Sequence, residues 1–408
     1  MTRFRLPDRI TLKGLEVAPS QFWGAVRLVP LIRRNAPGDL RLTKRSYKED
    51  AAVVSLGGEV MAPGTAYVSY VPHGLVMTWD EDGTPVAPFG THLNEGKKGK
   101  EDGKVWDCGP FSVRIADRMV KREGRQEDEN RLRLLPLHLA MEGFLGLYFN
   151  GPEIAWSEYS KQAISRGLGD RVESSLTGRG IIGLEDALRV LEIHENQVGV
   201  LLFVSGAMAA VSIVSHPEDY RALHRSLIED FFGEILFYYG LYGNDSEMFI
   251  RMNDAEVRSV SDLRPALGKM RKEWETFQLL MTEDLIGREV KLQRVYRAGP
   301  FQLARFITDL DRHKENHIGE VILRADGTVE YMKTFLLSEA QRKRAYLLSR
   351  LAEHNWNIDA TAASEKQHPT ELILRLEKAG FGYLLMQHVL DAAHSRRRRL
   401  SKQGKKSR

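Results

Sequence analysis

The sequence predicts an α+β protein with a β-rich N-terminal part, a mixed α/β middle, a helical connector and a C-terminal three-helix unit of helix-turn-helix type. Three observations predict it. Short apolar runs separated by proline, glycine and aspartate fill roughly the first 120 residues, an uncharged stretch at 198–215 divides into two strand-length halves, and three short helical patterns follow position 338. A chain of 408 residues, 42% hydrophobic and 28% charged, is globular and exceeds one ordinary core.

Domain boundaries follow the changes in these patterns. We expect a body over 1–245, a helical connector with a β-hairpin over 246–337, a helix-turn-helix unit over 338–394 and a basic disordered tail over 395–408. The N-terminal strands are expected at 26–32, 51–56, 67–71, 74–79 and 111–115. The stretch 94–104 is rich in Gly, Lys, Glu and Asp, so we expect a surface loop there.

The uncharged stretch 198–215 has about the length of a membrane span. Ser205-Gly206 lies at its centre, its two halves are rich in β-branched residues, and acidic residues flank it. We therefore expect a buried β-hairpin that turns at Ser205-Gly206, with a membrane helix as the alternative.

The next segments alternate between helix and strand. Ser215 and Glu218 predict a capping box with Pro217 in the first turn, followed by a helix whose apolar face includes Tyr220 and Phe231. Residues 254–310 are highly charged with apolar positions at helical spacing, which predicts a long helix that bridges domains. The segment 317–337 predicts a hairpin that turns at 325–328.

The C-terminal unit has clear local signals for three helices. Ser338 and Gln341 form the pattern of a capping box, a second short helix is expected at 358–364, and Pro369 begins a third that ends at Gly380. Three short helices with a tight second link are typical of a helix-turn-helix, in which the third helix lies in the major groove. A small bundle for dimerisation or partner docking is the alternative.

The run 346–381 resembles the Fis-type helix-turn-helix found at the end of many bacterial transcription activators. The matching features are the leucines of the first helix, Trp356-Asn357, Ala362, Leu372, Leu376 and Gly380. The resemblance implies DNA binding, with Thr370, Glu371 and Arg375 placed to reach the groove. The turn departs from the family pattern, because Lys366-Gln367 replace the usual glycine and aliphatic residue.

The basic charge of the chain is concentrated after this unit. Eight of the 59 Lys and Arg residues lie between 394 and 408 with no acidic residue among them, which leaves 51 basic against 55 acidic residues elsewhere. Such a tail can bind DNA phosphates without reading sequence, or can simply be solvated. The candidate phosphate-binding residues are Arg396, Arg397, Arg398, Arg399, Lys402, Lys405 and Lys406.

Three segments of the body resemble the ARPP families, the "ARG and rhodanese–phosphatase-superfamily-associated" proteins. They are LPLHLAMEGFLGLYF (135–149), GIIGLEDALRVLEIHENQVGVLLFVSG (180–206) and HPEDYRALHRSLIEDFFGEI (216–235), within a resemblance that covers about 10–240. The resemblance implies a function alongside ADP-ribose and NAD chemistry and supplies no catalytic residues.

The body contains no complete catalytic, phosphate-binding or metal-binding motif, so we predict no catalytic residues, no cofactor and no metal. A cluster of polar and aromatic residues after Gly151-Pro152 is our candidate ligand pocket; its members are Glu153, Trp156, Glu158 and Tyr159.

Cys108 is the single cysteine, which excludes an internal disulfide and favours a reducing compartment. With no secretory signal pattern at the N-terminus, we expect a cytoplasmic protein with no membrane partner.

DNA is the expected partner; a small-molecule ligand and homodimerisation stay open. The function expected is a DNA-binding regulator or DNA-associated accessory protein. The alternatives are an enzyme or sensor of NAD/ADP-ribose metabolism and an interaction protein without nucleic acid.

Overall fold

The computed structural model confirms the α+β class. It describes residues 4–44, 193–228, 252–311 and 313–406, together with short pieces at 53–55, 66–68, 75–79 and 132–134 and single positions within 141–149, at 184 and within 232–236. Contacts divide the chain into two units. Unit 1 comprises 1–46, 72–116 and 176–337, and unit 2 comprises 47–71, 117–175 and 338–408.

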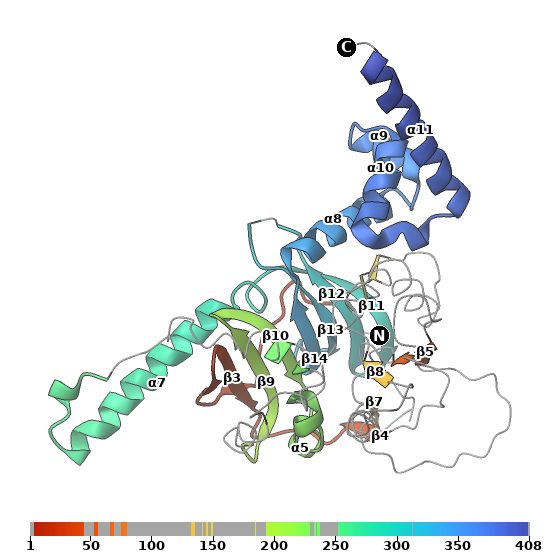
Figure 1. Cartoon of the computed structure of the whole chain (residues 1–408). Coiled ribbons are helices and arrows are strands. Elements are labelled where there is room, and N and C mark those ends of the chain that lie inside the picture. Colours follow the sequence, from red (N-terminus) through yellow and green to blue (C-terminus); the bar gives the residue numbers. More distant parts are fainter. Residues whose placement is uncertain are drawn as a thin grey trace, which may run out of the picture. The chain divides into compact units, whose positions relative to one another are not determined.

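Unit 1 is built on a nine-stranded antiparallel sheet (Figure 1). The strand order is β1-β3-β9-β10-β14-β13-β12-β11, and β2 pairs with β3. The strands are β1 Glu16–Val17, β2 Gln21–Trp23, β3 Val26–Ile32, β9 Gln197–Val204, β10 Ala207–Ile213, β11 Val290–Ala298, β12 Phe301–Thr308, β13 His317–Arg324 and β14 Val329–Leu336. A separate pair joins β4 Leu40–Lys44 to β7 Leu75–Trp79.

The uncharged stretch forms the predicted hairpin. Strands β9 and β10 pair antiparallel on either side of Ser205-Gly206. Both turn residues have positive φ, +47° and +85°, as a tight hairpin turn requires. Every residue of β9 is buried, which explains its lack of charge. Within the described parts of the chain, no helix is long and apolar enough to cross a membrane.

The prediction of one long helix over 254–310 is wrong for its second half. A 3₁₀ turn, Asp254–Glu256, and the helix α7, Val260–Thr282, come first, and β11 and β12 follow as a hairpin within the main sheet. Val290 and Leu292 alternate with charged residues and face the core, which is a strand period. Only the second half of the segment lies in the main sheet, and the whole of 254–310 belongs to unit 1, so it does not bridge the two units.

The hairpin predicted at 317–337 is confirmed as β13 and β14. Its turn uses Gly327 at a φ of +86°, and Asp326 accepts a hydrogen bond of 2.9 Å from the backbone N–H of Thr328. One face of the sheet packs against the N-terminal segment and the residues after α7. This core includes Ile10, Val29, Leu31, Leu201, Phe203, Val211, Ile213, Leu285, Phe306, Val321, Leu323 and Met332.

Helix α5, Pro217–Ser226, forms where the sequence predicts a helix, but its cap differs. The side chain of His216 caps it by accepting from the backbone N–H of Glu218 at 3.3 Å. The side chain of Ser215 is buried and instead donates to the backbone carbonyl of Leu40, so it is unavailable to cap the helix.

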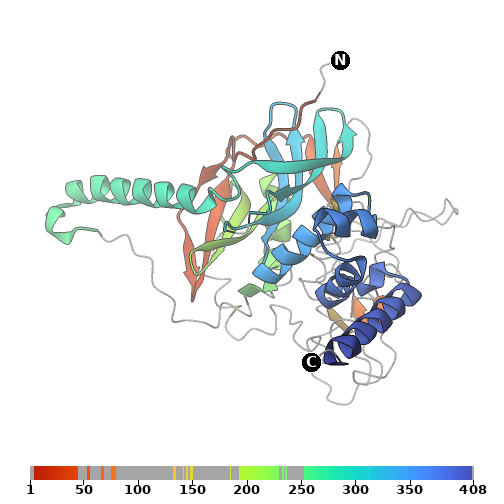
Figure 2. The same ribbon diagram turned by 90° about the horizontal axis from the view of Figure 1, so that it is seen from above.

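Helix α7 extends away from the main sheet (Figure 2). Its second half is held to the sheet by Arg27, whose buried guanidinium lies 4.8 Å from the ring centre of Trp274 and 5.6 Å from that of Phe277. Burial lowers the pKa of Arg27 to about 10, so the side chain stays a cation at neutral pH. Cation–π contacts therefore take the place of a counter-ion here.

Unit 2 contains a small sheet and the C-terminal helices. The sheet joins β5 Val53–Ser55, β6 Ala66–Val68 and β8 Leu132–Leu134. The helices are α8 Glu339–Glu353, α9 Ile358–Ser364, α10 Pro369–Leu376 and α11 Gln387–Lys406, with short turns η5 Glu377–Phe381 and η6 Gly382–Leu384. Strands predicted at 51–56, 67–71 and 74–79 are confirmed in part, whereas 111–115 and the loop 94–104 lie outside the described residues.

Candidate nucleic-acid interface

The three predicted helices of the C-terminal unit form: α9 has the predicted bounds, and α10 begins at Pro369 as predicted but ends at Leu376, before the turn η5 that contains Gly380. Ser338 and Gln341 make the capping box of α8, with bonds of 3.3 and 2.9 Å. Gly380 has a φ of +87°, the left-handed conformation expected after α10. The small core of these helices comprises Leu347, Leu348, Leu351, Ala362, Leu372, Leu376 and Phe381.

The turn between α9 and α10 is tight. Lys366 adopts a φ of +53°, in the region that glycine occupies most easily. The backbone N–H of Thr370 donates to His368 Nδ1 at 3.0 Å, and Pro369 begins the helix. Lys366 thus adopts a backbone conformation that a glycine would adopt with less strain.

The candidate groove residues of α10 do not share one environment. Thr370 is buried, with 9% of its surface exposed, while Glu371 and Arg375 are exposed. Arg375 Nη1 forms an ion pair of 2.5 Å with Glu365 Oε2. Of the three candidates, Glu371 and Arg375 can meet a ligand at the surface, and Arg375 already has an anionic partner.

The predicted disordered tail is helical in the structure. Helix α11 begins at Gln387, packs against α10 through Leu390 and Ala393, and continues to Lys406. His394 Nε2 lies 2.8 Å from Glu377 Oε2, which holds the helix near its middle. Beyond this contact the side chains of Arg396, Arg397, Arg398, Arg399 and Lys402 are all exposed. Lys405 and Lys406 belong to the same helix.

The segment is helical because the first half of α11 packs against the other C-terminal helices. Leu390 and Ala393 lie three residues apart, so one face of α11 is buried against the unit and fixes the helix direction. Lysine and arginine near the C-terminal end of a helix also interact favourably with its dipole.

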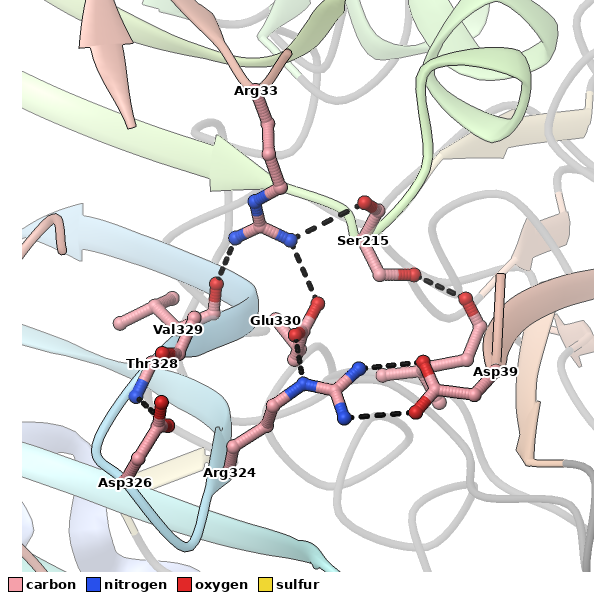
Figure 3. Close-up of polar contacts among 9 residues, drawn as sticks. Arg33, Asp39, Ser215, Arg324, Asp326, Thr328, Val329 and Glu330 are labelled. Atoms are coloured by element: carbon pink, nitrogen blue, oxygen red, sulfur yellow. Dashed lines mark hydrogen bonds and ion pairs between the residues drawn. The ribbon is translucent and has the colours of Figure 1, made fainter. Parts of the chain in front are cut away.

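A second cluster of charges lies within unit 1 (Figure 3). Buried Glu330 accepts from Arg33 Nη1 at 2.7 Å and from Arg324 Nε. Arg324 also forms a two-pronged pair with Asp39, at 2.5 and 2.8 Å, which lowers the pKa of Asp39. Arg33 follows β3 and Asp39 precedes β4, so the cluster links the ends of these strands to β13 and β14. Two arginines and two carboxylates balance in charge, so the cluster has no net charge to attract another ion.

A third group of polar residues crosses the middle of the sheet. Lys333 lies directly opposite both Glu320 and Ser212, and Glu320 lies opposite Arg305, so all four face one side of the sheet. Arg305 Nε lies 3.4 Å from Glu320 Oε1. Burial raises the pKa of Glu320 to about 7 and lowers the pKa of Lys333.

Neither of these two clusters was predicted from the sequence. Charged residues inside otherwise apolar strands were a signal, as in HIGEVILR for Glu320 and VEYMKTFL for Lys333. Their partners could not be assigned without the strand register. The predicted pocket residues Glu153, Trp156, Glu158 and Tyr159 lie outside the described residues. In the part of the chain that the structure describes, no group of three His, Cys, Asp or Glu residues could hold a metal ion.

The fold is thus an α+β body, made of an antiparallel sheet with a projecting helix, and this body is followed in the chain by C-terminal helices. The model of the ARPP-2 family matches residues 10–299, and the chain belongs to that family. The match confirms the ARPP-type body and extends it through α7 and β11. It ends before the C-terminal helices begin. No curated protein and no solved structure matches the chain.

Proposed function

We propose that this ARPP-2 protein is a DNA-binding regulatory or DNA-associated accessory protein, whose C-terminal unit contacts DNA and whose body is free to sense a ligand. The observation that carries the proposal is the second half of α11. Seven Lys and Arg residues and no acidic residue lie between 396 and 406 on one continuous helix. The single cysteine favours a reducing compartment, so we place this function in the cytoplasm.

Electrostatics favour a polyanion on this helix. Arg398 and Lys402 are four residues apart, as are Lys402 and Lys406, and like charges at this spacing repel each other. DNA phosphates relieve that repulsion and release condensed counterions, which gives affinity without sequence reading. Phosphate contacts also fix the position of the protein on the duplex, so that α10 approaches a groove.

A charge-matched pair of variants tests the proposal. The first replaces Arg396, Arg397, Arg398 and Arg399 by glutamine. The control replaces four exposed basic residues of α7, Arg264, Lys269, Arg271 and Lys272, by glutamine. The two variants change the net charge equally, and only the first removes the proposed contacts.

We expect the α11 variant to bind a duplex about 10²- to 10³-fold more weakly at 0.1 M salt, measured by fluorescence anisotropy, since each lost phosphate contact lowers affinity several-fold. The α7 variant should bind as the unmodified protein does. Equal losses in both variants would mean that net charge alone matters. If the unmodified protein binds no DNA, the C-terminal helices are a bundle for assembly or partner docking.

A further inference from the structure

A single carboxylate, that of Glu365, joins the helices α8, α9 and α10. Glu365 is the C-terminal cap residue of α9, and only 13% of its side chain is exposed. Its Oε2 accepts from Arg375 of α10 at 2.5 Å and from Gln367 Nε2 of the turn at 2.9 Å. Its Oε1 lies 3.7 Å from Nε of Arg350 on α8.

The surroundings hold this carboxylate in place. Arg350 is itself fixed by a bond of 3.2 Å from Nη2 to Ser364 Oγ and by an ion pair with Glu353. The bond from Gln367 fixes the carboxylate from the turn side. Because the Glu365 carboxylate is partly buried and is held by two arginines and an amide, it binds the guanidinium of Arg375 more strongly than a mobile surface carboxylate would.

Arg375 is the basic residue of α10 that was expected to reach the groove, and 43% of its side chain is exposed. The other exposed charge near it on that helix, Glu371, is acidic. While Arg375 is paired with Glu365, α10 therefore offers no unpaired guanidinium to a phosphate or to a base edge. Any DNA contact by Arg375 must first replace the carboxylate.

We propose that Glu365 restrains DNA binding by this unit, because it holds Arg375 in an internal ion pair and leaves phosphate contact to the basic residues of α11. The inference rests on the proposed function. It identifies the duplex phosphate backbone as the group that competes with Glu365 for Arg375.

The test uses the full chain with Glu365→Gln. Glutamine keeps the shape of the side chain and can still bond Gln367, but it loses the charge that holds Arg375. We expect about 3- to 10-fold tighter duplex binding at 0.1 M salt, and a plot of log affinity against log salt that is steeper by about 0.9, the contribution of one added phosphate contact. Asp359→Asn, which removes one exposed acid of α9, is the matched control and should change affinity much less.

Arg375→Ala completes the test. In the unmodified protein it should lower duplex affinity less than in the Glu365→Gln background and should leave the salt slope unaltered, because Arg375 is already occupied by Glu365 there. In the Glu365→Gln background it should abolish the gain. The non-additivity of the two changes is the signature of the restraint.

Three results would overturn the inference. The first is Glu365→Gln binding no better than Asp359→Asn while amide protection of the unit is intact. The second is a salt slope flatter by about 0.9 on Arg375→Ala alone, which would show that Arg375 already contacts a phosphate and which also decides the question if Glu365→Gln does not fold. The third, failure of the unmodified protein to bind any duplex, would remove the proposed function as well, which distinguishes it from the other two.

Discussion

Glu320 is buried opposite Lys333 and Arg305, and its Oε2 has no hydrogen-bond partner among the described residues. Burial raises the pKa of this carboxyl from its ordinary 4.5 to about 7. Between these two values the folded protein binds more protons than the unfolded chain. The Glu320 contribution therefore weakens the fold progressively as the pH rises from about 4.5 to about 7, and it changes no further above that.

Glu320→Gln should remove this contribution. As the pH rises from 4.5 to 7, the free energy of unfolding of Glu320→Gln should increase relative to that of the unmodified protein. The increase should be at most about 1.4 kcal/mol per pH unit. Urea denaturation at half-unit pH steps measures it. Glu371→Gln, at an exposed position, is the control. A difference that is flat with pH would show that the Glu320 carboxyl titrates as it does in water.

Lys366 illustrates a second residue-scale effect, the backbone strain at the turn before α10. A left-handed φ of +53° destabilises a residue that has a side chain by about 1–2 kcal/mol. Glycine avoids this strain, but it loses more conformational freedom on folding, so only part of that energy is regained when glycine replaces Lys366. We expect Lys366→Gly to stabilise the C-terminal unit by about 0.5–1 kcal/mol.

Amide hydrogen exchange over α9 and α10 measures that gain as slower local opening. Lys366→Ala is the control, since alanine keeps the strain and should give no comparable gain. Faster exchange in Lys366→Gly than in Lys366→Ala would contradict the left-handed turn.

At the scale of elements, the sequence predicts best where the signals are local. The bounds of α9 and the start of α10 follow from Asn357 and Pro369, and the two hairpins follow from their turns. The strands β11 and β12 were missed because the charged residues on one face of β11 looked like a solvated helix. Charge also misled at α11, where burial of Leu390 and Ala393 against α10 outweighs the repulsion that follows.

The charge clusters of the sheet show why site geometry is harder to predict than elements. Arg33 and Glu330 are 297 residues apart in sequence and 2.7 Å apart in space. Only the strand order β3-β9-β10-β14 and the register of each pair bring their side chains together. By contrast, Glu365 and Arg375 are ten residues apart, so a helix-turn-helix prediction already places them near each other.

At the scale of the whole molecule, the family match covers the body and ends before the C-terminal helices. The ARPP-2 match ends at residue 299, and α8 begins at Glu339. The body contains the main sheet with its internally balanced cluster around Glu330, whereas the described basic side chains of α11 beyond His394 are exposed to solvent. The proposed function therefore predicts that DNA contact depends on the C-terminal unit.

The salt dependence of duplex binding tests this prediction most directly. The full chain and a chain ending at 394 are titrated with two duplexes of unrelated sequence between about 0.05 and 0.2 M salt. We expect the full chain to bind both duplexes with a steep slope, and the shortened chain to lose affinity equally for both with a slope flatter by several units, because phosphates carry no sequence information. An unchanged slope and affinity after removal of 395–408 would contradict the account.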